Sequence, residues 1–371
     1  MEEKMSDTSY ASFDKLESFM RDVFIKVGVP PGDAAVCADI LIESDKRGID
    51  SHGIGRFKPI YIDRIKDGIQ NPVTNFEIVK DHLATAVVDG HDGMGHVIGK
   101  MSMRMAIDKA KKYGLGMVVT RNSTHYGIAG YYATMAAKEN MIGITGTNAR
   151  PSIAPTFGID NMLGTNPLTF GIPTDEDFPF VLDCATSVSQ RGKIEHYERI
   201  GKTMPEGWVI NRDGTSETDP AKALVGLTKD TCALAPLGGL GEDTAGYKGY
   251  GYAAVVEILS AALQQGLFLK ALNGIGADGK KTPYHLGHFF IAIDINAFIE
   301  PAQFKKTTGD ILRELRASAK APGHDRIYTA GEKEYLAWLS RKDKGVPLND
   351  SLKKTLKSLI DEYKLDNYQF D

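Results

Sequence analysis

Cysteine is scarce in this chain of 371 residues, which holds only Cys37, Cys184 and Cys232. The three are far apart, odd in number and absent from any C-x-x-C pair, which argues against a disulfide framework and against a thiolate zinc site. No H-x-x-x-H or H-E-x-x-H pattern occurs either, so we expect no metal site.

Long apolar runs and a strong charge excess are missing as well. The longest apolar stretch, from Tyr252 to Leu269, contains Glu257, Gln264 and Gln265 and is too polar to span a bilayer. The first residues are acidic and lack the apolar core of a signal peptide, so we expect a soluble, cytoplasmic protein with no membrane partner. The formal net charge is −4, and no basic run is interleaved with aromatics, so we expect no nucleic-acid partner.

Glycine, in contrast, is abundant, with 39 residues, or about one in ten against a usual ~7%. The glycines follow no period, so we assign them to turns, close packing and ligand approach. The hydrophobic fraction of 42% and the charged fraction of 25% are ordinary for a globular protein, and the length suggests two or three domains.

Apolar periodicity predicts a helical segment, an α/β centre and a second helical segment. We place their limits at residues 1–80, 81–301 and 302–371, and expect the two helical ends to pack together. The predicted helices cover residues 13–27, 33–47, 57–67, 97–113, 127–140, 252–265, 305–317, 332–341 and 351–363. The predicted strands cover residues 85–88, 116–120, 142–145, 168–172, 180–182 and 289–293.

A glycine pattern over residues 89–99 lies between a predicted strand and a predicted helix, where a Rossmann phosphate loop would lie. Its spacing is G-x-G-x-x-x-G, and the next strand ends in Thr120 and Arg121 rather than in the acidic residue that holds a ribose. We therefore favour a helix entry in which Gly99 allows close packing over a Rossmann fingerprint.

The segment from Asp50 to Arg56 holds the first candidate for chemistry. His52 stands between Ser51 and Gly53 in a predicted turn, where an imidazole can take or give a proton near neutral pH. The guanidinium of Arg56, at the start of the next helix, can bind a carboxylate through two hydrogen bonds. This pair suits a 2-hydroxy or 2-oxo acid, although a helix-capping turn with a solvated arginine explains the same pattern.

Two further candidates follow predicted strands. Residues 121–130 begin where a parallel strand ends, the usual place for ligands in α/β proteins, and His125 there is a second acid/base candidate. Asp183 ends another strand, where it either orients a catalytic imidazole or belongs to a plain helix cap. Free N–H groups and hydroxyls at the helix start that follows can also hold a phosphate.

Four loops rich in turn formers complete the pattern. Residues 148–151 and 164–167 carry hydrogen-bonding side chains, and residues 238–251 hold six glycines and Lys248 ahead of a long helix. A glycine-rich turn with one lysine suits a nucleotide, but the G-K-[ST] end of a P-loop is missing. The turn at residues 321–326 is typical of a linker when taken alone.

Taken in order, these motifs resemble the malate/L-lactate dehydrogenase family of the non-Rossmann type, which includes ureidoglycolate and sulfolactate dehydrogenases, diketogulonate reductase and piperideine-carboxylate reductase. The resemblance extends from about residue 12 to residue 365. Each motif alone is weak, but six in the same order are specific. The matching segments are residues 51–53, 122–127, 183–187, 246–251, 286–293 and 322–324.

The resemblance implies an α/β, non-Rossmann dinucleotide-binding domain with a mixed sheet, a helical domain built from both chain ends, and a homodimer. It implies that His52 and His125 are catalytic, with Asp183 as a partner of the catalytic histidine. It implies that Arg56 contacts the substrate carboxylate, and we add Ser51 and Arg150 as candidate substrate contacts. The implied cofactor contacts are Asn148, Cys184, Ala185, Thr186, Ser187, Val188, Ser189, Gln190, Tyr247, Lys248, Gly323, His324 and Asp325.

The implied reaction is hydride transfer between NAD or NADP and a small 2-hydroxy or 2-oxo acid, with either histidine as the principal acid/base. Malate is favoured because its second carboxylate suits a second cation, for which Arg150 and Lys58 are candidates. L-lactate, sulfolactate and ureidoglycolate oxidation, or reduction of a cyclic imine or 2-oxo sugar acid, are alternatives within this class. A protein that senses the cofactor without turnover is an alternative outside it, disfavoured by the pair His52 and His125.

Overall fold

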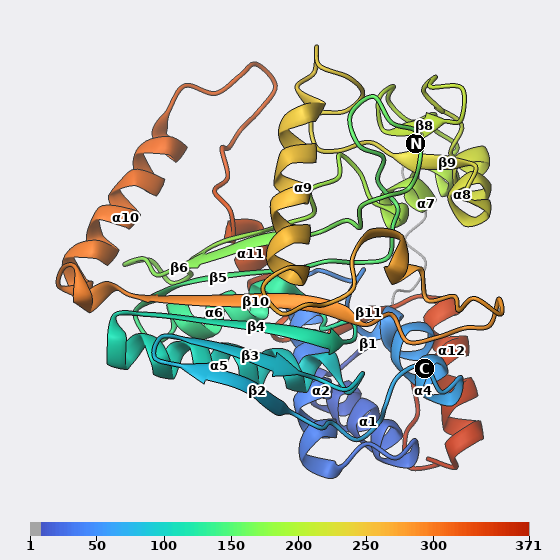
Figure 1. Ribbon diagram of the computed structural model, residues 1–371, viewed down its shortest axis with the longest axis horizontal. Helices are drawn as coiled ribbons and strands as arrows, with labels where there is room; N and C mark the ends of the chain where they lie inside the picture. The colour runs from blue at the N-terminus through green and yellow to red at the C-terminus, as the bar shows by residue number, and fades with distance from the viewer. Residues whose placement is uncertain (1–8, 371) are drawn as a thin grey trace.

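A seven-stranded mixed sheet forms the centre of the computed structural model, which describes residues 9–370 (Figure 1). Only β3 and β4 pair in parallel, and every other neighbouring pair is antiparallel. This pattern differs from a doubly wound parallel Rossmann sheet and confirms the predicted α/β fold class. In spatial order the strands are β2 (Glu77–His82), β3 (Thr85–Asp89), β4 (Leu115–Ser123), β10 (Leu286–Asp294), β5 (Met141–Thr147), β6 (Leu168–Ile172) and β7 (Phe180–Cys184).

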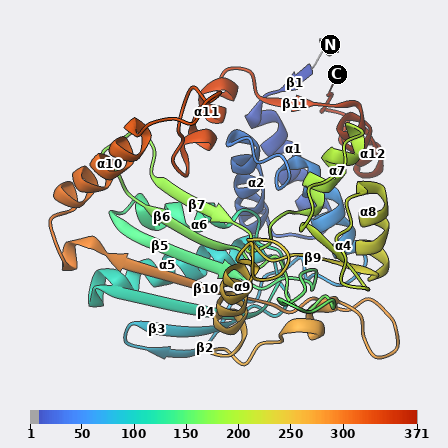
Figure 2. The same ribbon diagram turned by 90° about the horizontal axis from the view of Figure 1, so that it is seen from above.

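Helices cover both faces of this sheet. The helices α5 (Gly95–Tyr113) and α6 (Ala129–Ala137) pack on one face, and α9 (Gly246–Ala261) stands nearly upright on the other, with its C-terminal end nearest the sheet (Figures 1 and 2). Because side chains alternate along a strand, Val118 lies in the apolar cluster under α5 and α6, whereas Val119 contacts the cluster that includes Val256 of α9.

The glycines of α5 serve its close packing rather than a phosphate loop. A Cβ atom on Gly95 would lie 2.3 Å from the Thr124 carbonyl oxygen, and one on Gly99 would lie 2.8 Å from the Tyr132 ring. Such distances leave no room for a side chain, so both positions require glycine. The favoured interpretation of residues 89–99 as a helix entry agrees with this packing.

The two chain ends meet in one helical body. Strand β1 (Ser9–Ala11) pairs antiparallel with β11 (Val346–Leu348), and α1 (Phe13–Lys26), α2 (Pro31–Lys46) and α12 (Asp350–Tyr363) share one apolar cluster. Helix α11 (Glu332–Arg341) packs beside α2. Helix α10 (Pro301–Ala317) contributes nothing to that cluster and projects from the far end of the sheet (Figure 2). The limits at residues 80 and 301 stay a prediction.

A small lobe between β7 and α9 was not predicted. It has its own apolar cluster, in which Ile194, Val209 and Leu234 are buried against Ala253 of α9. The apolar runs of the lobe are too short to give a periodic signal, so its helices and strands were not predicted from the sequence. The lobe consists of α7 (Arg191–Arg199), β8 (Val209–Asn211), α8 (Pro220–Lys229) and β9 (Cys232–Leu234).

The helix predicted over residues 57–67 is instead three short pieces. They are α3 (Ile54–Arg56), a π-helical turn η1 (Phe57–Ile62) and α4 (Asp63–Lys66). Pro59 lies within the wide turn, where it has no N–H to donate to a normal helical hydrogen bond. Two 3₁₀ turns, η2 (Leu269–Asn273) and η3 (Ile295–Ala297), complete the described chain, and none of its helices is long and apolar enough to cross a membrane.

Candidate active site

The two candidate catalytic histidines lie against each other although they are far apart in the sequence. The ring centroids of His52 and His125 are 5.8 Å apart, and the rings are nearly parallel at 22°. His52 comes from the turn after α2, and His125 from the loop between β4 and α6. The fold therefore brings together the pair that the sequence singled out.

The buried carboxyl group of Asp45 anchors the turn that carries His52. Asp45 accepts a hydrogen bond from the Ile54 N–H through Oδ2 at 2.8 Å. A Cβ atom on Gly53 would lie 2.0 Å from Asp45 Oδ1, so only glycine allows this approach. Burial raises the pKa of Asp45 to about 8, so its carboxyl is mostly neutral near neutral pH.

Helix α11 fastens the same turn from the C-terminal end of the chain. The Arg341 guanidinium donates to the Asp45 carbonyl at 2.7 Å and to both carboxylate oxygens of Asp50, at 2.5 and 2.9 Å. One guanidinium therefore joins the end of α2 to the residue that precedes the Ser51–His52 pair. No sequence pattern indicated this contact, because Arg341 and Asp50 are 291 positions apart in the chain.

The ring of His52 is a proton acceptor in this environment. Its Nδ1 lies 2.9 Å from the Ser51 hydroxyl, and the Arg56 Nε donates to the Ser51 carbonyl at 2.8 Å. Burial, followed by the nearby charge of Arg56, lowers the pKa of His52 to about 4. The imidazole is therefore neutral near neutral pH and can take a proton.

His125 is more strongly desolvated. Its Nδ1 lies 2.7 Å from the Tyr61 hydroxyl and 3.2 Å from the Gly127 amide nitrogen. Burial, together with His52 and the positive charge of Arg64, lowers the pKa of His125 well below its ordinary value. Both imidazoles are thus neutral, and both face cations.

Arg64 is the main site residue that the sequence did not single out. Its guanidinium stacks on Tyr284 at 4.5 Å from the ring centroid, and burial and the charge of Arg150 lower its pKa. Among residues 9–370, Arg56, Arg64 and Arg150 form no ion pair with a carboxylate. Lys58, the other expected cation, is paired with Asp63 at 2.7 Å.

The segments expected to hold a cofactor meet beside α9. Within residues 184–190, the Thr186 carbonyl accepts from the Leu237 N–H at 2.8 Å. The first turn of α9 presses on the same loop, because a Cβ atom on Gly249 would lie 2.2 Å from the Leu237 carbonyl oxygen. These contacts place residues 184–190 close to residues 247–248.

Unpaired polar groups in these segments fit a dinucleotide. Ser187 and Ser189 are buried, and their hydroxyl oxygens have no hydrogen-bond partner in the described part of the chain. Tyr247 is exposed, with the Lys248 ammonium 5.8 Å from its ring centroid. Buried hydroxyls without partners are costly, and a phosphate or ribose can satisfy them.

Two other expected cofactor contacts stand apart. Asn148 is buried and uses its amide within the protein, since Oδ1 accepts from the Gly287 N–H at 2.8 Å and Nδ2 donates to the Leu267 carbonyl at 3.2 Å. The turn at residues 323–325 is exposed, and no hydrogen bond between described residues joins it to residues 184–190. Cofactor contacts at these positions stay predictions.

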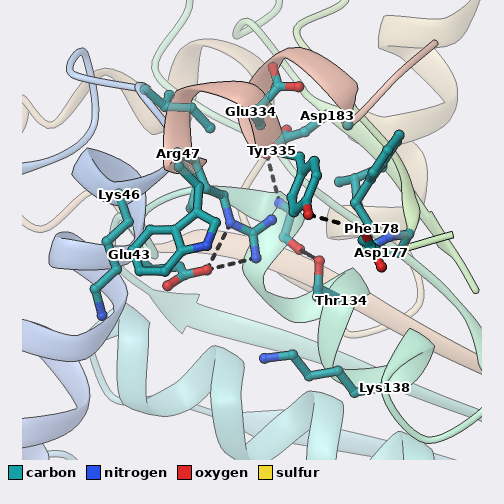
Figure 3. A pocket seen from close by; sticks show the side chains of 17 residues that line it. Glu43, Lys46, Arg47, Thr134, Lys138, Asp177, Phe178, Asp183, Glu334 and Tyr335 are labelled. Carbon is teal, nitrogen blue, oxygen red and sulfur yellow. Dashed lines mark hydrogen bonds and ion pairs between the residues drawn. The ribbon is translucent and has the colours of Figure 1, made fainter. Parts of the chain in front are cut away.

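The expected role of Asp183 as a partner of the catalytic histidine stays a prediction. Its carboxylate accepts hydrogen bonds from the Gly130 N–H at 2.7 Å and the Thr169 hydroxyl at 3.0 Å, and no hydrogen bond joins it to an imidazole among the described residues. Asp183 pairs with Thr169 in the β6–β7 register, which turns its side chain toward the start of α6. There it lines a cavity of about 460 Å³ that also contains Arg47 and Tyr335 (Figure 3), and desolvation raises its pKa.

Several known proteins similar to this chain in sequence and fold are dehydrogenases. Malate dehydrogenase of Pyrococcus horikoshii is 45% identical over 90% of this chain and 90% of its own length. L-sulfolactate dehydrogenase of Methanocaldococcus jannaschii is 41% identical over 92% of this chain and 93% of its own length. The crystal structure of malate dehydrogenase from Entamoeba histolytica superimposes with a TM-score of 0.93 at 47% identity, covering 98% of this chain and 99% of that one.

The non-Rossmann sheet and these relatives together define a hydroxy-acid dehydrogenase that uses a nicotinamide cofactor. The chain belongs to the malate/L-lactate dehydrogenase family, whose family model matches residues 11–357. The resemblance stated from the sequence motifs is thereby confirmed.

The first prediction concerns the pKa of His52. In a histidine-selective NMR titration of the free protein, we expect the His52 ring to titrate near pH 4, because burial and Arg56 both disfavour its charged form. Arg56→Met removes the smaller cause and raises the midpoint only partly toward 6.5. A wild-type midpoint near 6.5 contradicts the buried, neutral imidazole.

The second prediction concerns the Gly53 contact. Gly53→Ala places a methyl group on the Asp45 carboxyl and displaces the His52 turn, so kcat falls by about 100-fold. The matched control is Gly55→Ala in the same turn, where the new Cβ atom meets only the Asp50 carbonyl at 3.5 Å and kcat stays near the wild-type value. Equal kcat values in steady-state assays of the two variants contradict this account.

Proposed function

We propose that the protein oxidises malate to oxaloacetate, and catalyses the reverse reduction, with NAD or NADP. The observation that carries the proposal is that Arg56 and Arg64, which have no carboxylate partner among the described residues, lie near two neutral imidazoles, with Arg150 near Arg64. Three cations with no acidic partner suit a dianionic substrate. The related proteins named for malate and sulfolactate both act on dianions, whereas L-lactate carries one carboxylate.

The proposed roles follow from position. Arg56 holds the C1 carboxylate beside His52, and Arg64 holds the second carboxylate with support from Arg150. His52 takes the hydroxyl proton during oxidation and returns it during reduction, because its neutral ring is the available base. When bound, the nicotinamide supplies the hydride acceptor or donor for C2. The two histidines in contact favour this chemistry over a cofactor sensor without turnover.

Residues 184–190 and 247–248 hold the cofactor in this proposal. The unpaired hydroxyls of Ser187 and Ser189 supply hydrogen bonds for its phosphate or ribose groups, and Cys184 contributes through its backbone. Lys248 adds a positive charge on the exposed first turn of α9. Steady-state kinetics measured with NAD and with NADP identify the preferred cofactor.

The third prediction tests the substrate. Arg64→Gln removes the cation assigned to the second carboxylate, so KM for malate rises by about 10- to 100-fold, while the weak turnover of L-lactate changes little. Steady-state kinetics on malate, sulfolactate, L-lactate and ureidoglycolate measure this difference.

The matched control is Lys58→Gln. Its ammonium is already paired with Asp63, so this variant keeps the wild-type kinetics for both substrates. Wild-type protein that prefers L-lactate to malate contradicts the proposed substrate. An equal loss on malate and L-lactate in Arg64→Gln contradicts the role given to Arg64.

We also propose that the protein is a homodimer. Tyr252, Val255 and Ile258 form an exposed apolar face on α9, and Ile311 and Leu315 do so on α10. Both helices stand on the same side of the sheet (Figure 1). Apolar faces of this size favour a partner that covers them, and a second copy of the chain offers the same faces in return.

The fourth prediction tests this assembly. In sedimentation velocity, the wild-type protein runs as a dimer, and Ile258→Asp shifts it to a monomer, because a carboxylate in a closed apolar interface is costly. Val225→Asp changes an equally exposed valine on α8 and leaves the dimer intact. A wild-type monomer, or a dimer insensitive to Ile258→Asp, contradicts the proposal.

A further inference from the structure

The guanidinium of Arg64 has donors to spare. Arg64 is partly buried in the short helix α4, and its side chain makes no hydrogen bond to another residue among residues 9–370. An arginine carries five N–H donors, and leaving them without partners in a partly buried position is costly. A negatively charged ligand can satisfy them, so the direction of this guanidinium decides which ligand the site accepts.

Tyr284 is the contact that restrains this direction. The Arg64 Cζ atom lies over the Tyr284 ring, 4.5 Å from the ring centroid. An aromatic face attracts a guanidinium through its charge, and a stacked guanidinium keeps its in-plane N–H donors free. Tyr284 can therefore hold Arg64 in place without competing with a carboxylate for its donors.

The loop that carries Tyr284 folds back on itself ahead of β10. The Thr282 N–H donates to the Gly274 carbonyl at 2.9 Å, and the Gly276 N–H donates to the Lys280 carbonyl at 2.8 Å. We call residues 274–285 the Tyr284 hairpin. It lies beside α4, which carries Arg64 (Figure 1).

Two contacts between opposite charges anchor the Tyr284 hairpin on either side of Tyr284. The Lys281 ammonium lies 2.7 Å from Asp67, which directly follows α4. The His285 Nδ1 lies 2.9 Å from Asp92, in the loop between β3 and α5. The tyrosine is thus fixed relative to the helix whose arginine it contacts.

Gly274 restrains the tyrosine ring directly. A Cβ atom on Gly274 would lie 2.6 Å from Tyr284 Cε1, so the ring packs against the bare backbone at this position. The φ angle of Gly274 is +71°, which also favours glycine. A methyl group here has no room unless the Tyr284 ring moves.

We propose that Tyr284 is a positioning residue that directs the Arg64 guanidinium toward the second carboxylate and thereby sets the preference for a dianionic over a monoanionic substrate. This inference rests on the proposed function, in which Arg64 holds that carboxylate. Tyr284 acts through Arg64, so it affects substrate binding and leaves hydride and proton transfer unchanged. L-lactate has no second carboxylate, and its turnover does not depend on Tyr284.

The fifth prediction is the effect of Tyr284→Leu on the full-length protein. The KM for malate rises by about 10-fold and kcat changes less than threefold, because the variant loses binding shared by the ground state and the transition state. The kcat/KM for L-lactate stays near the wild-type value. Tyr284→Phe keeps the aromatic face and the wild-type kinetics for both substrates.

The matched control is Tyr113→Leu. Tyr113 is an exposed tyrosine at the end of α5, and its ring centroid lies 5.0 Å from the Lys112 ammonium. This variant removes a similar contact far along the sequence from Arg64 and keeps the wild-type KM for malate. A malate KM that rises equally in Tyr113→Leu and Tyr284→Leu overturns the inference.

A double-mutant cycle tests whether Tyr284 acts through Arg64. If it does, Tyr284→Leu adds nothing to the rise in malate KM that Arg64→Gln causes, and the double variant matches Arg64→Gln alone. A merely structural role of Tyr284 makes the two effects multiply. Multiplying effects therefore contradict the positioning role.

Two glycine variants separate the contact with Tyr284 from backbone strain. Gly274→Ala and Gly279→Ala both place alanine at a positive φ in the Tyr284 hairpin, at +71° and +77°. Only the first new Cβ atom meets the Tyr284 ring, since nothing lies within 4 Å of the second. Gly274→Ala raises the malate KM as Tyr284→Leu does, whereas Gly279→Ala keeps it; the opposite order contradicts the inference.

An NMR measurement without substrate reports the contact itself. The Arg64 Nε–H signal, identified by its loss in Arg64→Gln, lies upfield in the wild type because of the Tyr284 ring current, and Tyr284→Leu moves it downfield. An unchanged signal in Tyr284→Leu overturns the inference, as does a raised malate KM in Arg64→Gln with an unchanged one in Tyr284→Leu. A wild-type malate KM in Arg64→Gln instead contradicts the proposed function.

Discussion

The contact between the Asp45 carboxyl and the Gly53–Ile54 backbone is the interaction on which the geometry of the site depends. It fixes the turn that presents His52, and it requires both a glycine and a carboxyl group kept mostly neutral by burial. Arg341 extends this support to α11, so residues near the C-terminus hold a turn near the N-terminus. The packing of the two chain ends into one helical body also helps to place the imidazole, since Ile54 of this turn is buried in the apolar cluster of that body.

The buried position of His52 and His125 determines their pKa values. Burial alone makes both imidazoles neutral, and the neighbouring guanidiniums lower their pKa values further. Arg64 lies near Arg150, and no ion pair with a carboxylate in the described chain offsets their repulsion. In the proposed function, a substrate with two negative charges supplies the missing partners, and its binding would raise the pKa of His52. Binding and proton transfer are therefore coupled through charge.

How much of this was predictable depends on where each signal lies in the sequence. Long amphipathic helices such as α1, α11 and α12 were predicted within a few residues, because their apolar faces repeat strongly. His52 and His125 were found from their turns and their place after a strand. The hydrogen bonds of Asp183 to Gly130 and Thr169 were not predicted, because the direction of its side chain depends on strand register, which one sequence does not determine. Tyr61 and Arg64 were missed because they lie in a segment with the pattern of an ordinary helix, where Pro59 was the only sign of a wide turn.

Close packing of the backbone explains much of the abundance of glycine. Several of the tight positions bring helices onto the sheet: a Cβ atom on Gly116 would lie 2.0 Å from the Ala106 carbonyl oxygen, and Cβ atoms on Gly143 and Gly171 would each lie 2.5 Å from the Ala133 carbonyl oxygen. Gly53 and Gly249 use the same freedom to hold the catalytic turn and the loop beside the cofactor segments. Backbone approach, rather than flexible ligand loops, therefore sets the positions of the site residues. A site built in this way tolerates changes in exposed side chains, but it loses its geometry when a single methyl group is added at a tight glycine.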